Sequence, residues 1–248
     1  MALVVKDKKA IFLKVRDPKK YTDVLDQAGI KYKQDGHKLA VRHNVDTFKI
    51  LSNLGARLEN FEPMRSYYEY PKLHGVYDPM KHQEETAVFV SQNPKAFVLN
   101  TQRTGKTASC LWAADYLLKE GVIDKVLICC TVSNCATWHD EVNAIFASRY
   151  SLVARGSRDV RKSVLRQKAD FHIINHDGIK VVSDIWENYI TSNLSFQRYS
   201  ACSPLLRPSI QLSSLNAITL AISVNRSMCF TAYSTLSLST THATPRAL

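Results

Sequence analysis

The amino-acid sequence has no Asp, Glu, Lys or Gly from Asn188 to Leu248, and the only charged side chains there are those of Arg198, Arg207, Arg226 and Arg246. The four missing residue types make up roughly a quarter of ordinary proteins, and disordered tails are usually rich in several of them. The region is instead rich in Ser, Thr and Leu, without a sustained helix or strand period. We therefore expect residues 188–248 to be an irregular, aberrant tail, either out-of-frame or disordered. A natural low-complexity tail is the alternative.

Signals for secretion, membrane insertion and zinc binding are also missing. Charges interrupt residues 1–15, where a signal peptide has an unbroken apolar run. No segment approaches the roughly 20 apolar residues that span a bilayer. We expect a cytoplasmic protein, in the host cytoplasm if it is viral, with no membrane partner. Its cysteines form neither a C-x-x-C pair nor a ligand set with histidines, which favours reduced core thiols; they are Cys110, Cys129, Cys130, Cys135, Cys202 and Cys229.

Positive charge is in excess. The chain of 248 residues has 33 Lys and Arg against 22 Asp and Glu, which gives a net charge of +11 and a pI near 9.4. This excess favours a polyanionic partner, most simply nucleic acid. Many of the lysines lie near the N-terminus: Lys6, Lys8, Lys9, Lys14, Lys19, Lys20, Lys31, Lys33 and Lys38.

Residues 1–62 have the pattern of a small basic α/β accessory domain. Strands are expected over residues 9–15 and 38–42, and helices over residues 17–28 and 45–54, the second capped by Asn44. The lysines of this domain either form a solvated surface or contact DNA. Residues 63–79 follow as a connector rich in Pro and Tyr, which is either a linker or an aromatic brace on the next domain.

From residue 80 to about residue 180, helical and strand-like patterns alternate. Alternation of this kind predicts a parallel sheet that is covered by helices on both faces. The expected helices are residues 83–91, 106–119 and 137–146, and the expected strands are a buried one at 97–99, then 125–130, 152–154 and 171–174.

The segment from Phe97 to Cys110, FVLNTQRTGKTASC, predicts a phosphate-binding loop between a strand and a helix. Such a loop needs a flexible glycine, a lysine for the β/γ-phosphates and a hydroxyl for Mg²⁺. Gly105, Lys106 and Thr107 supply these three groups. The first position of the G-x-x-x-x-G-K-[ST] pattern is Asn100 rather than Gly, so an ordinary turn with a surface lysine is the alternative.

A second candidate nucleotide contact is Gln83, which opens the helix before the strand of the loop. A glutamine amide carries both a donor and an acceptor, so it can pair with both edge groups of an adenine. Together with the loop, Gln83 therefore predicts binding of ATP.

These residues together resemble superfamily 2 helicases, and most closely the SNF2-like helicases and translocases of bacteriophages. Residues 77–107 are similar to the family's adenine-reading Q-motif followed by motif I, and residues 125–142 to motif Ia. Residues 156–161 resemble the Gly-Ser turn and basic helix that follow, and residues 170–179 resemble motif Ib. The resemblance covers about residues 76–180 in the family's order. It implies a RecA-like P-loop parallel sheet over residues 80–187, an incomplete first helicase lobe, preceded by the small α/β module and followed by the irregular tail.

The resemblance also implies roles for individual residues. Lys106 would bind the β/γ-phosphates of ATP, Thr107 the Mg²⁺ and Gln83 the adenine. The loop around the phosphates would be Asn100, Thr101, Gln102, Arg103, Thr104, Gly105, Lys106 and Thr107. Short polar side chains at strand ends suit phosphate oxygens, and those that would lie along DNA, expected to be double-stranded, are Thr131, Ser133, Asn134, Asn175 and His176.

Two departures from the family pattern bear on activity. Arg103 stands where the family often has Gly, so its side chain either crowds the loop or helps to neutralise phosphate. The family hydrolyses ATP with an Asp-Glu pair at a later strand end, but the only Asp-Glu here is Asp140-Glu141, inside motif Ia. We also expect no second RecA-like lobe with its arginine finger in this chain. The family function is ATP-dependent DNA translocation; for this chain we expect no catalytic acids and negligible turnover.

A non-enzymatic basic DNA-binding protein is the alternative function. A different P-loop enzyme, such as a kinase, is a third possibility.

Overall fold

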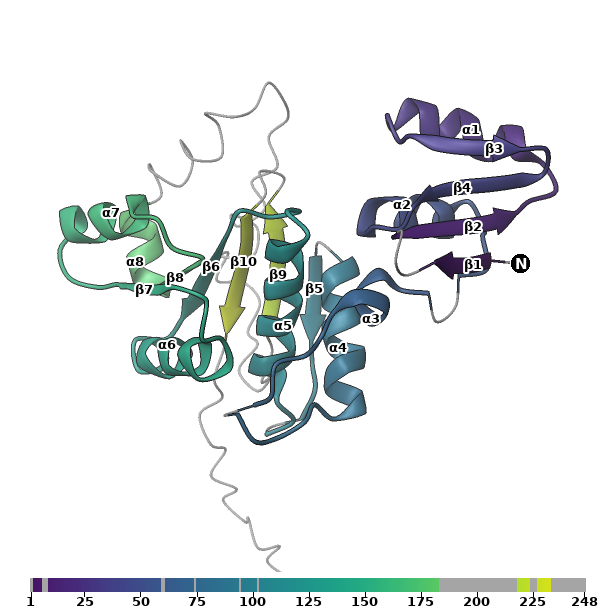
Figure 1. Ribbon diagram of the computed structural model, residues 1–248. Coiled ribbons are helices and arrows are strands. Elements are labelled where there is room, and N and C mark those ends of the chain that lie inside the picture. The colour runs from purple at the N-terminus through teal and green to yellow at the C-terminus, as the bar shows by residue number, and fades with distance from the viewer. Residues whose placement is uncertain are drawn as a thin grey trace, which may run out of the picture. The chain divides into compact units, whose positions relative to one another are not determined.

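The structure is a computed structural model that describes residues 2–5, 9–58, 61–73, 75–93, 95–101, 103–182, 218–223 and 227–232 (Figure 1). Contacts divide the chain into two compact units. The first consists of Met1–Pro94, Thr107–Val122 and Ala144–Phe146, and the second of Lys95–Lys106, Ile123–Asn143 and Ala147–Leu248.

The first unit begins with a four-stranded antiparallel sheet in the order β1-β2-β4-β3. Its strands are β1 (Ala2–Val5), β2 (Ala10–Lys14), β3 (Tyr32–Asp35) and β4 (Lys38–Arg42), and its helices are α1 (Pro18–Gln27) and α2 (Val45–Asn53). The Asp17 carboxylate and the Asn44 amide oxygen cap the two helices by accepting from Lys19 N at 3.1 Å and Thr47 N at 2.8 Å. The α/β expectation for this region is confirmed, with β1 and β3 as additional strands.

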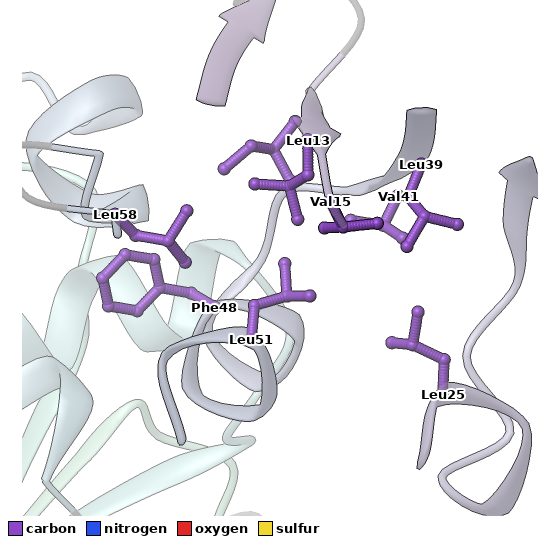
Figure 2. Close-up of a cluster of buried hydrophobic side chains, with 9 residues drawn as sticks. Leu13, Val15, Leu25, Leu39, Val41, Phe48, Leu51 and Leu58 are labelled. Carbon is purple, nitrogen blue, oxygen red and sulfur yellow. The ribbon is translucent and has the colours of Figure 1, made fainter. Parts of the chain in front are cut away.

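The core of this sheet lies on one face (Figure 2). Along β2 and β4, buried and solvent-facing side chains alternate, so that one face is apolar and packs against α1 and α2. Full burial of a Leu or Val side chain contributes about 1.5–3 kcal/mol, so this cluster holds the helices on the sheet. Its members are Ile11, Leu13, Val15, Leu25, Leu39, Val41, Phe48, Leu51 and Leu58.

The connector is an aromatic brace rather than a free linker. After α3 (Pro63–Tyr67), the Tyr70 ring meets the Trp112 ring of α5 (Lys106–Lys119) edge-on at 5.4 Å. The Tyr68 ring meets that of Tyr116 at 5.9 Å, and its hydroxyl donates to the buried Asp115 carboxylate at 2.8 Å. Edge-to-face pairs add about 0.5–1.5 kcal/mol each beyond their buried area. The first unit is completed by α4 (Lys81–Gln92).

His43 joins β4 to the connector and makes stability depend on pH. It is buried, with Nε2 2.6 Å from the Phe61 carbonyl oxygen and Nδ1 2.8 Å from the Tyr67 hydroxyl. A carbonyl only accepts, so Nε2 carries the proton and Nδ1 accepts from Tyr67. Burial lowers the pKa of His43 below its ordinary 6.5, against an opposing effect of the Phe61 hydrogen bond. Burial, followed by the charge of Lys125, lowers the pKa of His172 in the second unit in the same way.

We therefore expect the melting temperature to fall as the pH is lowered through about 6.5, because the unfolded chain then binds more protons than the folded one. The contribution of these histidines is fully present above that pH and is lost below it. Thermal unfolding of the wild type and of His43→Gln between about pH 7.5 and about pH 5.5 measures the effect. The variant should show a shallower pH dependence, and His37→Gln, at an exposed position, serves as the control. An identical pH dependence in wild type and His43→Gln would rule out this role of His43.

The second unit contains a six-stranded sheet in the order β5-β9-β10-β6-β8-β7 (Figure 1). The strands are β5 (Lys95–Val98), β6 (Lys125–Cys130), β7 (Ser151–Ala154), β8 (Phe171–Asn175), β9 (Ile218–Ser223) and β10 (Ser227–Ala232). Strands β10, β6, β8 and β7 pair in parallel, whereas β9 is antiparallel to both of its neighbours. The expectation of a parallel sheet is confirmed for β6, β8 and β7. It is wrong for the sheet as a whole, because the antiparallel β9 and the unexpected β10 separate β5 from these three strands.

Helices flank the strands of this second sheet. They are α6 (Asn134–Ile145), α7 (Arg158–Arg166) and α8 (His176–Val181). Leu165 of α7 packs in one cluster with Leu127, Ala154 and Ile174 of the strands, and Trp138 of α6 is a buried core residue. Cys110, Cys129, Cys130 and Cys135 are buried free thiols, as expected. Among the residues that the structure describes, no helix is long and apolar enough to cross a membrane.

Two strands lie within the region expected to be an irregular tail. The backbone of β9 pairs with β5 and β10, and that of β10 pairs with β6 from Ser227↔Lys125 to Thr231↔Cys129. The expectation of irregular structure is therefore wrong for these two segments. The physical reason is that their sequences, ITLAIS and SMCFTA, are short and largely apolar, which suits interior strands although no long period is present. The rest of residues 188–248 lies outside the described residues.

Candidate functional site

The polar segments singled out in the sequence follow strands that run in the same direction. Strand pairing places β5 and β6 parallel to each other, with β9 and β10 between them, and β8 next to β6. In register, Val98 of β5, Cys130 of β6 and Asn175 of β8 lie in one row across the sheet. The loops that follow these strands therefore lie along the same edge. At about 4.8 Å per strand, β5 and β6 are roughly 14 Å apart.

The phosphate loop predicted from the sequence connects β5 to α5. Gly105 has φ +74°, in the left-handed region that favours glycine, and α5 begins at the next residue. Lys106 Nζ donates to the carbonyl oxygens of Asn100 at 2.8 Å and Thr101 at 2.5 Å. Thr104 Oγ1 also donates to the Thr101 carbonyl, at 2.9 Å. The Lys106 ammonium group is thus held by carbonyl oxygens of its own loop. Gln102 of this loop lies outside the described residues.

This arrangement can hold an anion once the lysine turns away from the loop carbonyls. The first N–H groups of an α-helix have no partner within the helix and carry a partial positive charge. Lys106 stands at that end of α5 and is only half-buried, so its ammonium group can exchange two neutral oxygens for charged phosphate oxygens. The prediction that Thr107, the second residue of α5, binds Mg²⁺ stays untested.

The strand before the loop is not buried on both faces. Ala96 and Val98 are buried, but Phe97 and Leu99 are 51% and 58% exposed. The expectation of a buried strand at residues 97–99 is therefore wrong for Phe97 and Leu99 and is correct for Val98. The reason lies in the sheet order: β5 is the outermost strand on its side, next to β9.

Arg103 adopts φ +61°, the left-handed conformation that costs an L-residue roughly 1–2 kcal/mol. We expect Arg103→Gly to stabilise the chain by at most about 1 kcal/mol, because the relief of strain exceeds the extra backbone entropy of Gly in the unfolded chain. Urea denaturation measures the change. Thr104→Gly is the matched control: Thr104 is not among the residues with positive φ, so this change should destabilise. A loss of stability in Arg103→Gly would show that the arginine side chain supports the loop.

Gln83 is placed by α4, in the first compact unit. Its side chain is only 6% exposed, and its amide oxygen accepts from Met80 N at 3.0 Å, where it caps the helix. The adenine contact expected from the sequence requires this amide to leave the cap or to use its other atoms. The structure therefore assigns Gln83 a local structural role, and the nucleotide contact stays a prediction.

The loop after β6 presents short polar groups. Ser133 is exposed, its Oγ lies 3.3 Å from Thr131 Oγ1, and Asn134 N donates to the Thr131 carbonyl at 3.0 Å as α6 begins. The buried thiols of Cys130 and Cys135 lie at the two ends of this turn, with their Sγ atoms 3.5 Å apart. Burial raises the pKa of the Cys130 thiol, so this thiol stays protonated and acts as apolar packing. The three polar residues are thus brought together where β6 ends, and their contact with DNA stays a prediction.

The loop after β8 is tied to the turn after β7 by Arg161. The Arg161 guanidinium donates from Nη1 to Asn175 Oδ1 at 2.7 Å and from Nε to the Gly156 carbonyl at 2.8 Å. Asn175, expected to contact DNA, is therefore partly engaged within the chain, next to the half-buried His176. The sequence singled out the Gly-Ser turn and Arg161 but not their link to Asn175. Gly178 is the one signal that could have indicated it, since a small residue leaves room for the guanidinium.

Gly178 is required by this link. A Cβ at Gly178 would lie 1.8 Å from Arg161 Nη1, 2.8 Å from Asn175 Oδ1 and 2.9 Å from Ile174 Cγ1. We expect Gly178→Ala to displace Arg161 and to destabilise the chain by about 1–3 kcal/mol, as overpacking usually does. Chemical denaturation measures this in both the wild-type and Arg161→Ala backgrounds. Gly178→Ala should reduce the free energy of unfolding less in the Arg161→Ala background than in the wild type. An equal reduction in both backgrounds would show that Arg161 is not the obstacle.

Comparison with known proteins gives no sequence match. No protein-family model matches the chain, and no curated protein matches it. Among solved structures, the SWI2/SNF2 ATPase core of Sulfolobus solfataricus in complex with dsDNA is similar over 45% of this chain, with 14% sequence identity and a TM-score of 0.39. The similarity covers 23% of that chain. At this TM-score the likeness defines neither the fold nor the function of the present chain.

Proposed function

We propose that this chain binds ATP·Mg²⁺ and double-stranded DNA in the manner of an SNF2-like superfamily 2 helicase or translocase, and that it hydrolyses ATP slowly at best. The observation that carries this proposal is the closed loop between β5 and α5. There a glycine with φ +74° precedes a lysine that opens the helix and folds back onto the loop carbonyls. A phosphate group needs this glycine and helix N-terminus, with the Lys106 ammonium group turned from the carbonyls onto the phosphates and the Thr107 hydroxyl on Mg²⁺.

DNA binding is supported by the polar ends of the other parallel strands. Thr131, Ser133 and Asn134 follow β6, while Asn175 and His176 end β8 and begin α8. These loops lie along the same sheet edge as the phosphate loop, roughly 14–19 Å from it at about 4.8 Å per strand. Short side chains and N–H groups at strand ends suit the phosphate oxygens of DNA, and the net charge of +11 favours the same partner.

Slow turnover is expected because neither strand next to β6 carries a carboxylate. These strands are β10, with the sequence SMCFTA, and β8, with the sequence FHIIN. Hydrolysis of ATP in this class needs an acid that holds Mg²⁺ and another that orients the attacking water. Lys106 and the loop supply binding and charge neutralisation only, so the nucleotide should be bound and retained.

The experiment is to measure Mg²⁺-dependent binding of ATP to the purified chain and, separately, release of phosphate with and without duplex DNA. Binding of ATP without DNA-stimulated release is the expected result. No detectable ATP binding at millimolar concentration would rule out the nucleotide proposal. Release that DNA stimulates would show that a carboxylate outside the expected position completes the site.

A second candidate function, a non-enzymatic DNA-binding protein, is favoured by the positive charge alone. It predicts DNA affinity that falls steeply with salt and does not respond to nucleotide. Titration of duplex DNA with and without ATP·Mg²⁺ separates the two candidates, because only the first couples the two ligands.

A further inference from the structure

Among the residues that the structure describes, helices cover one face of the sheet of the N-terminal module and leave the other uncovered. Its buried face consists of side chains such as Leu13 and Leu39, which pack against α1 and α2 (Figure 2). The alternate positions of the same strands point away from that core. By strand register, these positions are Leu3, Val5, Ala10, Phe12, Lys14, Lys33, Asp35, Lys38, Ala40 and Arg42, which we call the open face.

An aromatic ring stands at the centre of the open face. Phe12 on β2 is directly opposite Leu3 of β1 and Ala40 of β4, and Ala40 is in turn opposite Lys33 of β3. Phe12 is 39% exposed and Leu3 is 60% exposed. Because Ala40 has only a methyl group, one side of the Phe12 ring has no bulky neighbour within its row. A large apolar ring on a solvated strand position is not needed by the core, which lies on the other face.

Positive charge lies on both sides of this ring. Lys14 and Lys38 face each other in the next row, with Asp35 opposite Lys38, and Arg42 lies in the row on the other side of Phe12. Rows on one face are two residues, or about 7 Å, apart. Like charges directly opposite each other destabilise a sheet, so the Lys14–Lys38 pair is not explained by the stability of the fold. Four cations against one carboxylate suit a polyanionic ligand.

We propose that the open face binds single-stranded nucleic acid, with an unstacked base on the Phe12 ring and phosphates at Lys14, Lys38 and Arg42. Bases within a duplex already stack on each other, so a ring that stands on a flat sheet reaches a base face only in a single strand. An exposed aromatic residue between cations on an antiparallel sheet provides both interactions that such ligands use. This site belongs to the N-terminal module and does not depend on the nucleotide loop.

Binding of a short fluorescein-labelled single-stranded DNA to the full chain, without nucleotide, tests the aromatic contact. Phe12→Ala should weaken binding about tenfold or more, as loss of base–aromatic stacking does elsewhere. Phe12→Trp should bind the single strand about as tightly as the wild type, and Phe12→Leu should bind it more weakly. This contrast separates stacking from general apolar contact and from misfolding. The matched control is Phe89→Ala on α4, which removes another exposed phenyl ring (48% exposed) and should leave affinity unchanged. Equal affinity of wild type and Phe12→Ala would overturn the proposal.

The salt dependence of the same binding tests the cations. Lys14→Gln combined with Lys38→Gln should lower the slope of log K against log salt by about 1.4, because each phosphate contact on a single strand contributes roughly 0.7. Lys19→Gln combined with Lys20→Gln removes the same charge from α1, on the covered side of the sheet, and should leave the slope nearly unchanged. The same slope change in both double variants would overturn the proposal. The assay contains no ATP, so its result is independent of the proposed nucleotide site.

Discussion

Replacing Trp112 by alanine is expected to destabilise the first compact unit by about 3–5 kcal/mol, the usual cost of deleting a large buried aromatic side chain. Trp112 is fully buried in α5, and its ring lies edge-on against Tyr70 of the connector at 5.4 Å. Its loss removes an edge-to-face pair and leaves a cavity between α5 and the connector. Native domains have only about 5–15 kcal/mol of stability, so this change removes a large share of it.

Urea denaturation followed by far-ultraviolet circular dichroism measures this effect without relying on the fluorescence of the deleted indole. Trp112→Phe provides the first control: it keeps the ring and also removes the indole Nε1, which is buried without a hydrogen-bond partner among the described residues. Its cost should be far smaller than that of alanine. Tyr77→Ala, which truncates an aromatic side chain that is 66% exposed, should have almost no effect. A loss below about 1 kcal/mol in Trp112→Ala would show that the brace does not support α5.

The brace illustrates which parts of the fold the sequence could predict. Residues 38–42, 106–119 and 125–130 form the elements expected of them, because alternation, helical composition and a continuous apolar run are local signals. Strand β3, with the sequence YKQD, has no apolar pattern and forms because β4 pairs with it. Strands β9 and β10 were missed since their pairing with β5 and β6 is a contact between distant parts of the chain.

The candidate site likewise has some features that local sequence patterns predict and others that they do not. The position of the phosphate loop follows from a strand, a glycine and a helix that are adjacent in sequence. The left-handed conformation of Arg103 could not be anticipated, because it is unusual for a residue other than Gly. The engagement of Asn175 by Arg161, 14 residues away, depends on the packing of neighbouring elements, and Gly178 is its one signal in the sequence. The use of Gln83 as a helix cap is a local contact three residues apart, which a glutamine at the third helical position can indicate.

Replacing Lys106 by alanine is expected to weaken ATP·Mg²⁺ binding by about 10- to 150-fold. Hydrogen bonds to charged groups contribute about 1.5–3 kcal/mol, and about 1.4 kcal/mol is a tenfold change in affinity. The expected loss takes account of what Lys106 gives up in the nucleotide-free chain, where it already donates to the Asn100 and Thr101 carbonyls. Exchange of these neutral acceptors for phosphate oxygens, rather than formation of new bonds, is the source of the affinity.

Isothermal titration with ATP·Mg²⁺ measures the loss, and the matched control is Lys168→Ala. Lys168 is exposed and precedes β8, so it lies near the amino-terminal edge of the sheet, whereas Lys106 follows β5 at the carboxyl-terminal edge. Both changes remove one positive charge from the second compact unit, so any effect of net charge alone appears equally in both. Loss of affinity confined to Lys106→Ala would place the phosphates at the loop. An equal loss in both variants would reduce the effect to long-range charge, and no loss in either would mean that ATP binds elsewhere.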